Sequence, residues 1–215
     1  MEPYELLHIT LLSVKVSLTA TLLSSAVGVP LGLFLATRAR WKRALSLLVN
    51  TAMGLPPVLL GLLLYLLLSR SGPLSFLGLL FTPEGMVLSQ FLLTLPIVAG
   101  LTMAAVEALP RDVKELIDSI STSPLYRYLF YLSEVRAHVF AASLTALARA
   151  VSEVGSVIIV GGNIRYHTRV LTTAIVYYTN AGDFEAALQL GGVLVLLYFA
   201  ANLLALAIRA RVVQA

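Results

Sequence analysis

The stretch RDVKELIDSISTSPLYRYLFYLSEVR, from Arg111 to Arg136, is polar and amphipathic in an otherwise apolar sequence, and the chain is organised around it. Asp112 with Glu115 three residues later matches an acidic variant of the capping box, which predicts that a helix starts there. Its apolar residues recur at helical spacing and are Val113, Leu116, Ile117 and Ile120. The residues that end this helix are Ser121, Thr122 and Ser123. Pro124 predicts a second short helix, and neither helix is long enough to cross a bilayer, so both are expected to lie at its surface.

A solvated loop between two membrane helices is the alternative interpretation of this stretch. The stretch nevertheless resembles the cytoplasmic coupling loop of type I ABC-importer permeases, whose pattern is E-A-A, then L-G-A-S, then about ten residues and L-P. Glu115-Leu116-Ile117 take the first positions, Ile120 to Ser123 the second, and Leu132-Ser133 the third, without the glycine and the late proline. The residues that the resemblance implies at a cytoplasmic ATPase are Asp112, Glu115, Leu116, Ile117, Ser121, Thr122 and Ser123.

The composition points to a membrane protein. Hydrophobic residues make up 59% of the chain and charged residues only 12%, which excludes an ordinary soluble domain. The chain contains no cysteine, so disulfides, thiol catalysis and thiolate metal sites are excluded. The basic pI near 9.5 is explained by lysine and arginine in cytoplasmic loops of a membrane protein.

Five apolar stretches are long enough to span a bilayer, which takes about 20 residues. They cover about residues 9–37, 44–69, 86–109, 137–161 and 184–208, and they predict an all-α polytopic permease domain over residues 1–215. Leu55-Pro56-Pro57 is expected to break the second span. Gly28 and Gly32 have the GxxxG spacing of closely packed helices. Leu171 to Tyr178 predicts one further short helix, and there is no GxxxxGK[ST] motif for binding a nucleotide.

The positive charges predict the orientation of these spans. One side collects Arg38, Arg40, Lys42, Arg43, Arg111, Lys114, Arg127, Arg136, Arg209 and Arg211, and the other collects Arg70, Arg165 and Arg169. Because cytoplasmic loops are enriched in lysine and arginine, the first side is expected to face the cytoplasm. The stretch from Arg111 to Arg136 and the C-terminus are then inside, and the N-terminus is outside the plasma or inner membrane.

A polar stripe marks the fourth span. Its members recur at three- and four-residue spacing, which predicts one helix face, and are Thr145, Arg149, Ser152, Glu153 and Ser156. Arg149 lies about 20 Å along the helix from Arg136, too far to reach water easily. Glu153, one turn away, is its expected partner. A buried ion pair that fixes helix packing and a lining of a transport path are both compatible with this pattern.

The loop from Gly161 to Ile175 carries a second candidate site. Its two guanidinium groups, hydroxyls and glycine N–H groups suit a tetrahedral oxyanion or a carboxylate of a partner protein. The residues concerned are Asn163, Arg165, Thr168, Arg169, Thr172 and Thr173. An ordinary membrane-surface loop is the alternative. His167 is interpreted as a surface residue, and no metal site is expected.

The motifs of these two segments resemble the molybdate/tungstate permeases. They are RAVSEVG at 149–155, GGNI at 161–164, Thr168-Arg169 and LTTAI at 171–175. GGNI and LTTAI, with Gly182-Asp183-Phe184 after them, are most similar to the tungstate branch. The resemblance implies one of two identical membrane subunits, served by a cytoplasmic ATP-binding subunit and an extracytoplasmic oxyanion-binding protein. It implies no cofactor on this chain, with ATP and magnesium on the partner subunit.

The sequence therefore predicts a transport subunit without its own catalytic site, which takes up an oxyanion by alternating access driven by a partner ATPase. Two alternatives stay open: an ATP-independent secondary transporter or channel, and a structural membrane subunit of a larger complex. Nucleic-acid binding is disfavoured because the basic residues are scattered over short loops.

Overall fold

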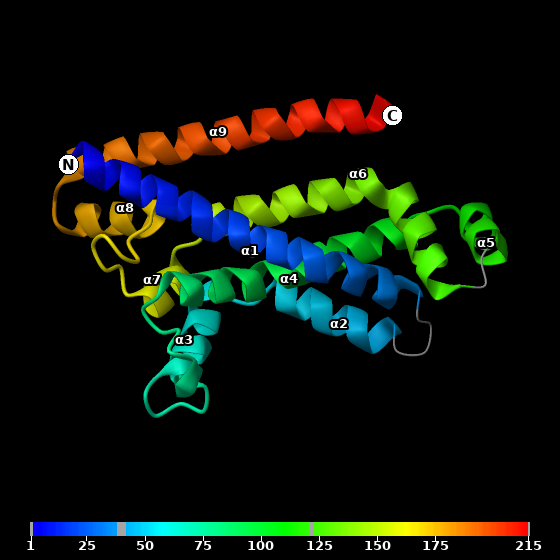
Figure 1. Cartoon of the computed structure of the whole chain (residues 1–215), viewed down its shortest axis with the longest axis horizontal. Helices are drawn as coiled ribbons and strands as arrows, with labels where there is room; N and C mark the ends of the chain where they lie inside the picture. Colours follow the sequence, from blue (N-terminus) through cyan, green and yellow to red (C-terminus); the bar gives the residue numbers. More distant parts are fainter. Residues whose placement is uncertain (1, 38–41, 121–122, 215) are drawn as a thin grey trace.

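The computed structural model describes residues 2–37, 42–120 and 123–214, and all regular structure in this part of the chain is helical. The helices are α1 (Pro3–Thr37), α2 (Lys42–Met53), α3 (Pro57–Leu68), the 3-10 turn η1 (Ser75–Leu77), α4 (Pro83–Glu107), α5 (Arg111–Ile120), α6 (Pro124–Val151), α7 (Gly155–Gly161), α8 (Leu171–Asn180) and α9 (Phe184–Gln214). Figure 1 shows an elongated bundle with α5 at one end and the N-terminus, α8 and the beginning of α9 at the other. The predicted all-α class is confirmed.

Three helices are long and apolar enough to cross a membrane by themselves: α1, α4 and the first part of α9, Phe184–Ala201. Two bent pairs qualify only when their halves are taken together, α2 with α3 and α6 with α7. Within the described residues the chain thus has three candidate spans, or five if each bent pair crosses once, in the places where the sequence predicts five.

The second predicted span breaks where the proline pair lies. α2 ends at Met53, α3 begins at Pro57, and the two axes differ by 98°. Proline has no N–H and its ring collides with the carbonyl one turn earlier, so a helix cannot run through two of them. Pro57 is instead the first residue of α3, where its missing donor is harmless.

Two expectations for the chain after α5 are wrong. The helix that starts at Pro124 is not short, because α6 continues without interruption to Val151. Where the coupling-loop pattern has a proline this chain has Ser133, which leaves the backbone hydrogen bonds intact. The fourth span is not one helix, because α6 and α7 are separated at residues 152–154 by a bend of 58°.

The packing of α1 on α4 depends on the two glycines of the first span. A Cβ at Gly28 would lie 2.9 Å from the Cβ of Val98, and one at Gly32 would lie 2.5 Å from the carbonyl oxygen of Ala99. Such contacts are too short for any side chain, so the two backbones approach closely only because both positions are glycine. The close packing predicted from the GxxxG spacing is confirmed.

Gly32→Ala is therefore expected to lower the thermal unfolding midpoint of the detergent-solubilised protein, since overpacking costs about 1–3 kcal/mol. Gly191→Ala is the matched control, because a Cβ on this α9 glycine meets no described atom within 4 Å. The control is expected to leave the midpoint unchanged or to raise it. Equal midpoints for wild type and Gly32→Ala would contradict the close contact.

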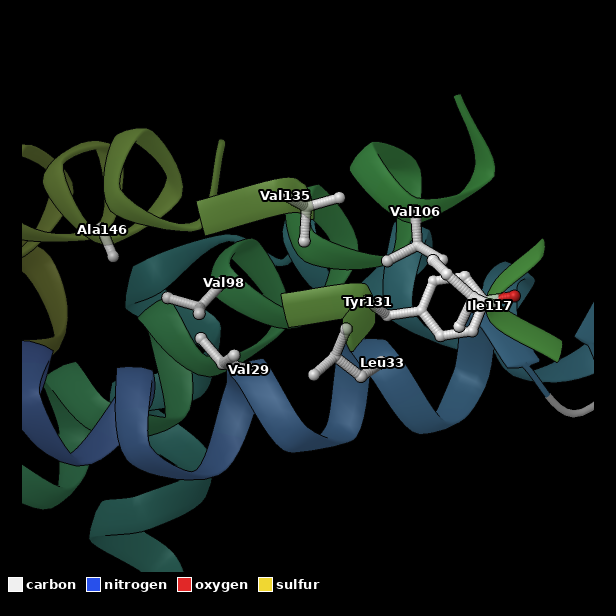
Figure 2. Packing of buried hydrophobic residues seen from close by; sticks show 8 residues of the cluster. All are labelled: Val29, Leu33, Val98, Val106, Ile117, Tyr131, Val135 and Ala146. Carbon is white, nitrogen blue, oxygen red and sulfur yellow. The ribbon is translucent and has the colours of Figure 1, made fainter. Parts of the chain in front are cut away.

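A buried apolar cluster joins α5 to the bundle. Its members come from four helices and are Val29, Leu33, Val98, Val106, Ile117, Tyr131, Val135 and Ala146. Figure 2 shows Ile117, the contribution of α5, at the end of the cluster where Tyr131 also lies. Ile117, 5% exposed, is thus the buried side chain through which α5 packs against α1, α4 and α6.

Candidate translocation path and coupling surface

The break between α6 and α7 is organised by one carboxylate. Glu153, 2% exposed, accepts a 2.6 Å hydrogen bond from Nη1 of Arg149 through Oε2. Its other oxygen, Oε1, accepts from the backbone N–H of Ser156 at 2.9 Å and from the Ser156 hydroxyl at 3.3 Å. Glu153 therefore neutralises the arginine and also satisfies the first turn of α7, which a buried carboxylate must do to be tolerated.

The backbone groups around the break are held by neighbouring helices. Gln90 of α4 donates from Nε2 to the carbonyl of Ala150 at 3.0 Å, and Thr172 of α8 donates to the carbonyl of Glu153 at 2.7 Å. Irregular backbone at membrane depth requires such protein partners, because lipid offers none. The break between α6 and α7 is thus stabilised by hydrogen bonds from α4 and α8.

The two broken spans meet near their breaks. A Cβ on Gly155, the first residue of α7, would lie 2.7 Å from Cγ2 of Val58 in the first turn of α3. A Cβ on Gly61, about one turn further along α3, would lie 2.8 Å from the Cα of Ser156. Interrupted helices that meet in this way are the setting in which transporters bind ions and small substrates.

The predicted polar stripe is only partly on one helix face. Thr145 and Arg149 lie on α6, Ser152 caps its C-terminus, Glu153 lies in the break, and Ser156 lies on α7. The single-face prediction is therefore wrong, because the helix ends at Val151. Thr145 and Ser152 are exposed and the Arg149 side chain is 34% exposed, whereas Glu153 and Ser156 are buried.

Polar contacts hold α5 against α4 and α6. Lys114 donates from Nζ to the carbonyl of Glu107 at the end of α4, at 2.7 Å. Asp118 lies 3.4 Å from the guanidinium of Arg127 and accepts a 3.4 Å hydrogen bond from the hydroxyl of Tyr131. Together with the buried Ile117, these contacts orient α5 so that its other side is exposed.

The open side of α5 and the first turns of α6 form what we name the coupling surface. It consists of the exposed apolar residues Leu116, Ile120, Leu125, Tyr126, Leu129 and Phe130. Leu116 and Ile120 are 58% and 59% exposed, although the sequence pattern placed them on the same apolar stripe as Ile117. An exposed apolar surface of this kind marks a contact with another protein or with a membrane.

The remaining predicted coupling residues have different structural roles. Asp112 lies inside the first turn of α5, which begins at Arg111, so its predicted role as the N-cap is wrong. Glu115 is exposed and pairs with Arg111 at 2.7 Å. Ser121 and Thr122 lie outside the described residues, and Ser123 is the N-cap residue of α6.

At the opposite end of the bundle, an acidic residue that the sequence pattern did not single out binds both Arg165 and Arg169. Glu5 of α1 is 2% exposed and accepts hydrogen bonds from Nη2 and Nε of Arg165, at 2.6 and 3.1 Å. Arg169 lies 3.4 Å and the Tyr178 hydroxyl 3.3 Å from the same carboxylate. The hydrogen bond to Glu5 raises the pKa of the Arg165 guanidinium above its ordinary value, so this side chain stays charged.

The hydroxyl groups of the loop from Gly161 to Ile175 have internal partners. Thr168 donates to the carbonyl of Gly161 and accepts from the N–H of Ile164, and Thr173 accepts from the N–H of Val170. Thr172 reaches the helix break, as described above. Asn163 adopts a left-handed backbone with φ of 50°, in the turn that follows α7. These residues shape the loop, and their contact with an oxyanion or a binding protein stays a prediction.

The comparison with protein families agrees with this architecture. Residues 28–214 match the model of the family described as binding-protein-dependent transport system inner membrane component. The chain belongs to this family. Within the family, it is 40% identical over 195 residues to a tungstate uptake system permease protein of Peptoclostridium acidaminophilum, a match that covers 90% of this chain and 86% of the relative.

Two further relatives are named for the transport of an anion or of molybdenum. A probable anion ABC transporter permease protein of Haloferax volcanii is 40% identical, over 96% of this chain and 91% of its own length. A molybdenum transport system permease protein of Azotobacter vinelandii is 31% identical, over 87% of each chain. Among solved structures, a chain of the MetNI methionine ABC transporter shares the fold with a TM-score of 0.83, at 17% identity and 99% coverage of both chains.

For this family member, Glu5→Ala is expected to lower the unfolding midpoint strongly. Arg169 has a side chain that is 8% exposed, and removing Glu5 would leave that buried charge without its carboxylate. Breaking a buried pair in this way costs on the order of 3 kcal/mol. Glu2→Ala, a change at an exposed residue one turn earlier, is the control and is expected to have little effect. Similar midpoints for the two variants would show that the contacts of Glu5 with Arg165 and Arg169 do not stabilise the fold.

Proposed function

We propose that this chain is the membrane-spanning permease subunit of an ATP-driven importer for an oxyanion, with tungstate as the first candidate and molybdate as the second. The observation that carries the proposal is the Arg149–Glu153 pair at a helix break, on a helix whose other end forms the exposed coupling surface. The relatives named for tungstate, anion and molybdenum transport support the choice of an oxyanion.

Arg149 suits the passage of a dianion. A tetrahedral oxyanion that leaves water loses strong hydration, and a guanidinium with a planar array of donors offsets part of that loss. Glu153 holds this group in place and reduces its net charge, so that binding stays weak enough for release. No bond of the ion is broken during transport, so no general acid, base or nucleophile is required.

The central path is formed by two copies of this chain. Thr145, Ser152 and the exposed part of Arg149 face outward from one copy, and polar side chains at membrane depth require a protein or water environment. A second copy supplies that environment and doubles the cationic groups. The buried members of the predicted path, Glu153 and Ser156, support the break rather than line the path.

The driving force comes from a cytoplasmic ATP-binding subunit that docks on the coupling surface. ATP and magnesium bind to that subunit, and this chain needs no cofactor. The end of the bundle with α5 is then cytoplasmic, and the end with the N-terminus, α8 and the outer loop faces the exterior, as the distribution of positive charges predicts. Closure of the ATPase pair moves α5 and α6 and opens the path outward, where it receives the ion.

On the exterior, an oxyanion-binding protein delivers the ion. Arg165, whose side chain is 54% exposed although it is paired with Glu5, is the outer residue best placed to meet a carboxylate of that protein. Asn163, beside it in the same turn, belongs to the same contact.

The decisive experiment is an uptake assay by metal content. Cells with and without this chain receive tungstate, alone or with an excess of molybdate or sulfate. Tungsten accumulation that depends on the chain, and that molybdate reduces more than sulfate, is the expected result. Unchanged accumulation in the cells without the chain, or uptake that persists without the ATPase subunit, would reject the proposal.

A further inference from the structure

The exposed side of α6 is polar over a longer distance than the predicted stripe. Glu134 and His138 are exposed and continue the spacing of Thr145, Arg149 and Ser152 towards the cytoplasmic end. At about 100° per residue, the members of this face fall within an arc of about 80°. They are Glu134, His138, Ala141, Thr145, Arg149 and Ser152.

This face, which we name the α6 polar face, lies beside the packed side of the helix. The buried residues of α6 occupy the neighbouring arc and are Tyr131, Val135, Ala142, Ala146 and Ala150. The face comprises the 19-residue stretch from Glu134 to Ser152, a rise of about 27 Å at 1.5 Å per residue, which is close to the thickness of the hydrocarbon core.

Lipid cannot be the environment of such a face. The partly exposed guanidinium of Arg149, in the middle of the fourth span, would be costly against acyl chains, and His138 lies on the same face in the first turn of that span. The other side of α6 is apolar: Leu144 and Leu147 line an apolar cavity there, together with residues of α1 and α9. The polar face therefore borders water or the matching face of a second copy.

We propose that His138 contacts the oxyanion on the cytoplasmic half of the path, between Arg149 and the exit, and that Glu134 marks the exit. The inference rests on the proposed function. The imidazole offers an N–H donor to a tetrahedral oxyanion about 16 Å along the helix from Arg149. The carboxylate of Glu134, one turn further, repels a dianion and so favours its release into the cytoplasm.

Because the chain contains no cysteine, single cysteine variants carry the only thiol in this subunit. His138→Cys and Ala141→Cys test the α6 polar face, and Phe140→Cys and Leu147→Cys are matched controls on the opposite side of the same helix. The assembled importer, in inside-out vesicles, is treated with an anionic, membrane-impermeant thiosulfonate. Positions 138 and 141 are expected to react, and tungstate or molybdate is expected to slow the reaction.

Transport measurements then test the role of His138 itself. His138→Leu is expected to reduce oxyanion uptake by about tenfold, the value of one hydrogen bond to a charged group, whereas His138→Gln keeps an N–H donor and is expected to retain most uptake. Controls that react as fast as positions 138 and 141, or equal uptake by the two His138 variants, would overturn the proposal.

The thiol reactions remain interpretable even if the ion has been assigned wrongly. Labelling of the α6 polar face without protection by tungstate or molybdate rejects the oxyanion contact of His138. Failure of the wild-type complex to take up tungstate or molybdate, in contrast, rejects the proposed function and is measured independently of any variant.

Discussion

Glu153→Ala is expected to abolish oxyanion uptake and to lower the unfolding midpoint more than Glu5→Ala or Gly32→Ala. The substitution leaves Arg149 without its counter-charge at membrane depth and removes the acceptor for the N–H of Ser156 at the start of α7. Loss of one partner of a buried pair costs on the order of 3 kcal/mol, and loss of a helix cap adds about 1 kcal/mol. Thermal unfolding in detergent and tungstate uptake are the two measurements.

Glu153→Gln separates the two roles of this carboxylate. The amide oxygen can still accept from Ser156, but the neutral side chain no longer balances Arg149, so an intermediate loss of stability is expected. In the double variant with Arg149→Gln and Glu153→Gln both charges are gone, and stability should recover relative to Glu153→Gln. Uptake should remain absent, because the cation for the dianion is missing.

The exposed pair Arg111–Glu115 is a matched control for these measurements, since it has the same i, i+4 spacing and a similar distance of 2.7 Å. Its two side chains are 92% and 65% exposed, and exposed pairs contribute little to stability. Glu115→Ala should therefore leave the unfolding midpoint unchanged. Full uptake by the double variant that lacks both charges of the Arg149–Glu153 pair would mean that this pair serves packing alone.

Leu116→Asp is expected to weaken binding of the ATPase subunit by roughly a hundredfold, because a carboxylate then replaces an apolar contact at the centre of the coupling surface. The side chain of Leu116 is 58% exposed, so α5 itself should stay folded through Ile117 and the Asp118 contacts. Co-purification of the ATPase subunit with the permease is the measurement.

Phe76→Asp is the control for the coupling surface. Phe76 is 78% exposed and lies in η1, in the loop between α3 and α4, far from α5 in Figure 1. The same change of chemistry there should leave ATPase binding intact. If Leu116→Asp bound the ATPase as tightly as wild type, α5 would not be the docking element.

The sequence predicted the elements that depend on local pattern. Apolar runs located the candidate spans, the proline pair located the break at Pro56, and the short helix predicted from Leu171 to Tyr178 corresponds to α8 at Leu171–Asn180. The Arg149–Glu153 pair followed from i, i+4 spacing, and the Gly28 and Gly32 contact followed from their spacing. Each of these features was predicted from residues that lie close together in the sequence, where a periodic or compositional pattern is informative.

The features that were missed depend on tertiary contacts. No proline marks residues 152–154, and the break there is stabilised by Gln90 and Thr172, which come from other helices. Glu5 meets Arg165 across 160 residues of sequence, and nothing near Glu5 in the chain predicts the partner. The one available signal was an acidic residue in the first turn of an apolar span, at the end where two arginines needed counter-charges.

The continuity of α6 has a mechanical consequence. One helix of 28 residues, about 42 Å long, bears part of the proposed ATPase contact at its beginning and Arg149 near its end, with no glycine or proline after Pro124. The rotation of the beginning of α6 about the helix axis is therefore fixed relative to that of Arg149, and so is the distance between them. Inserting a single alanine after Ser133 would turn one end relative to the other by about 100°, whereas a seven-residue insertion would restore the phase to within about 20°.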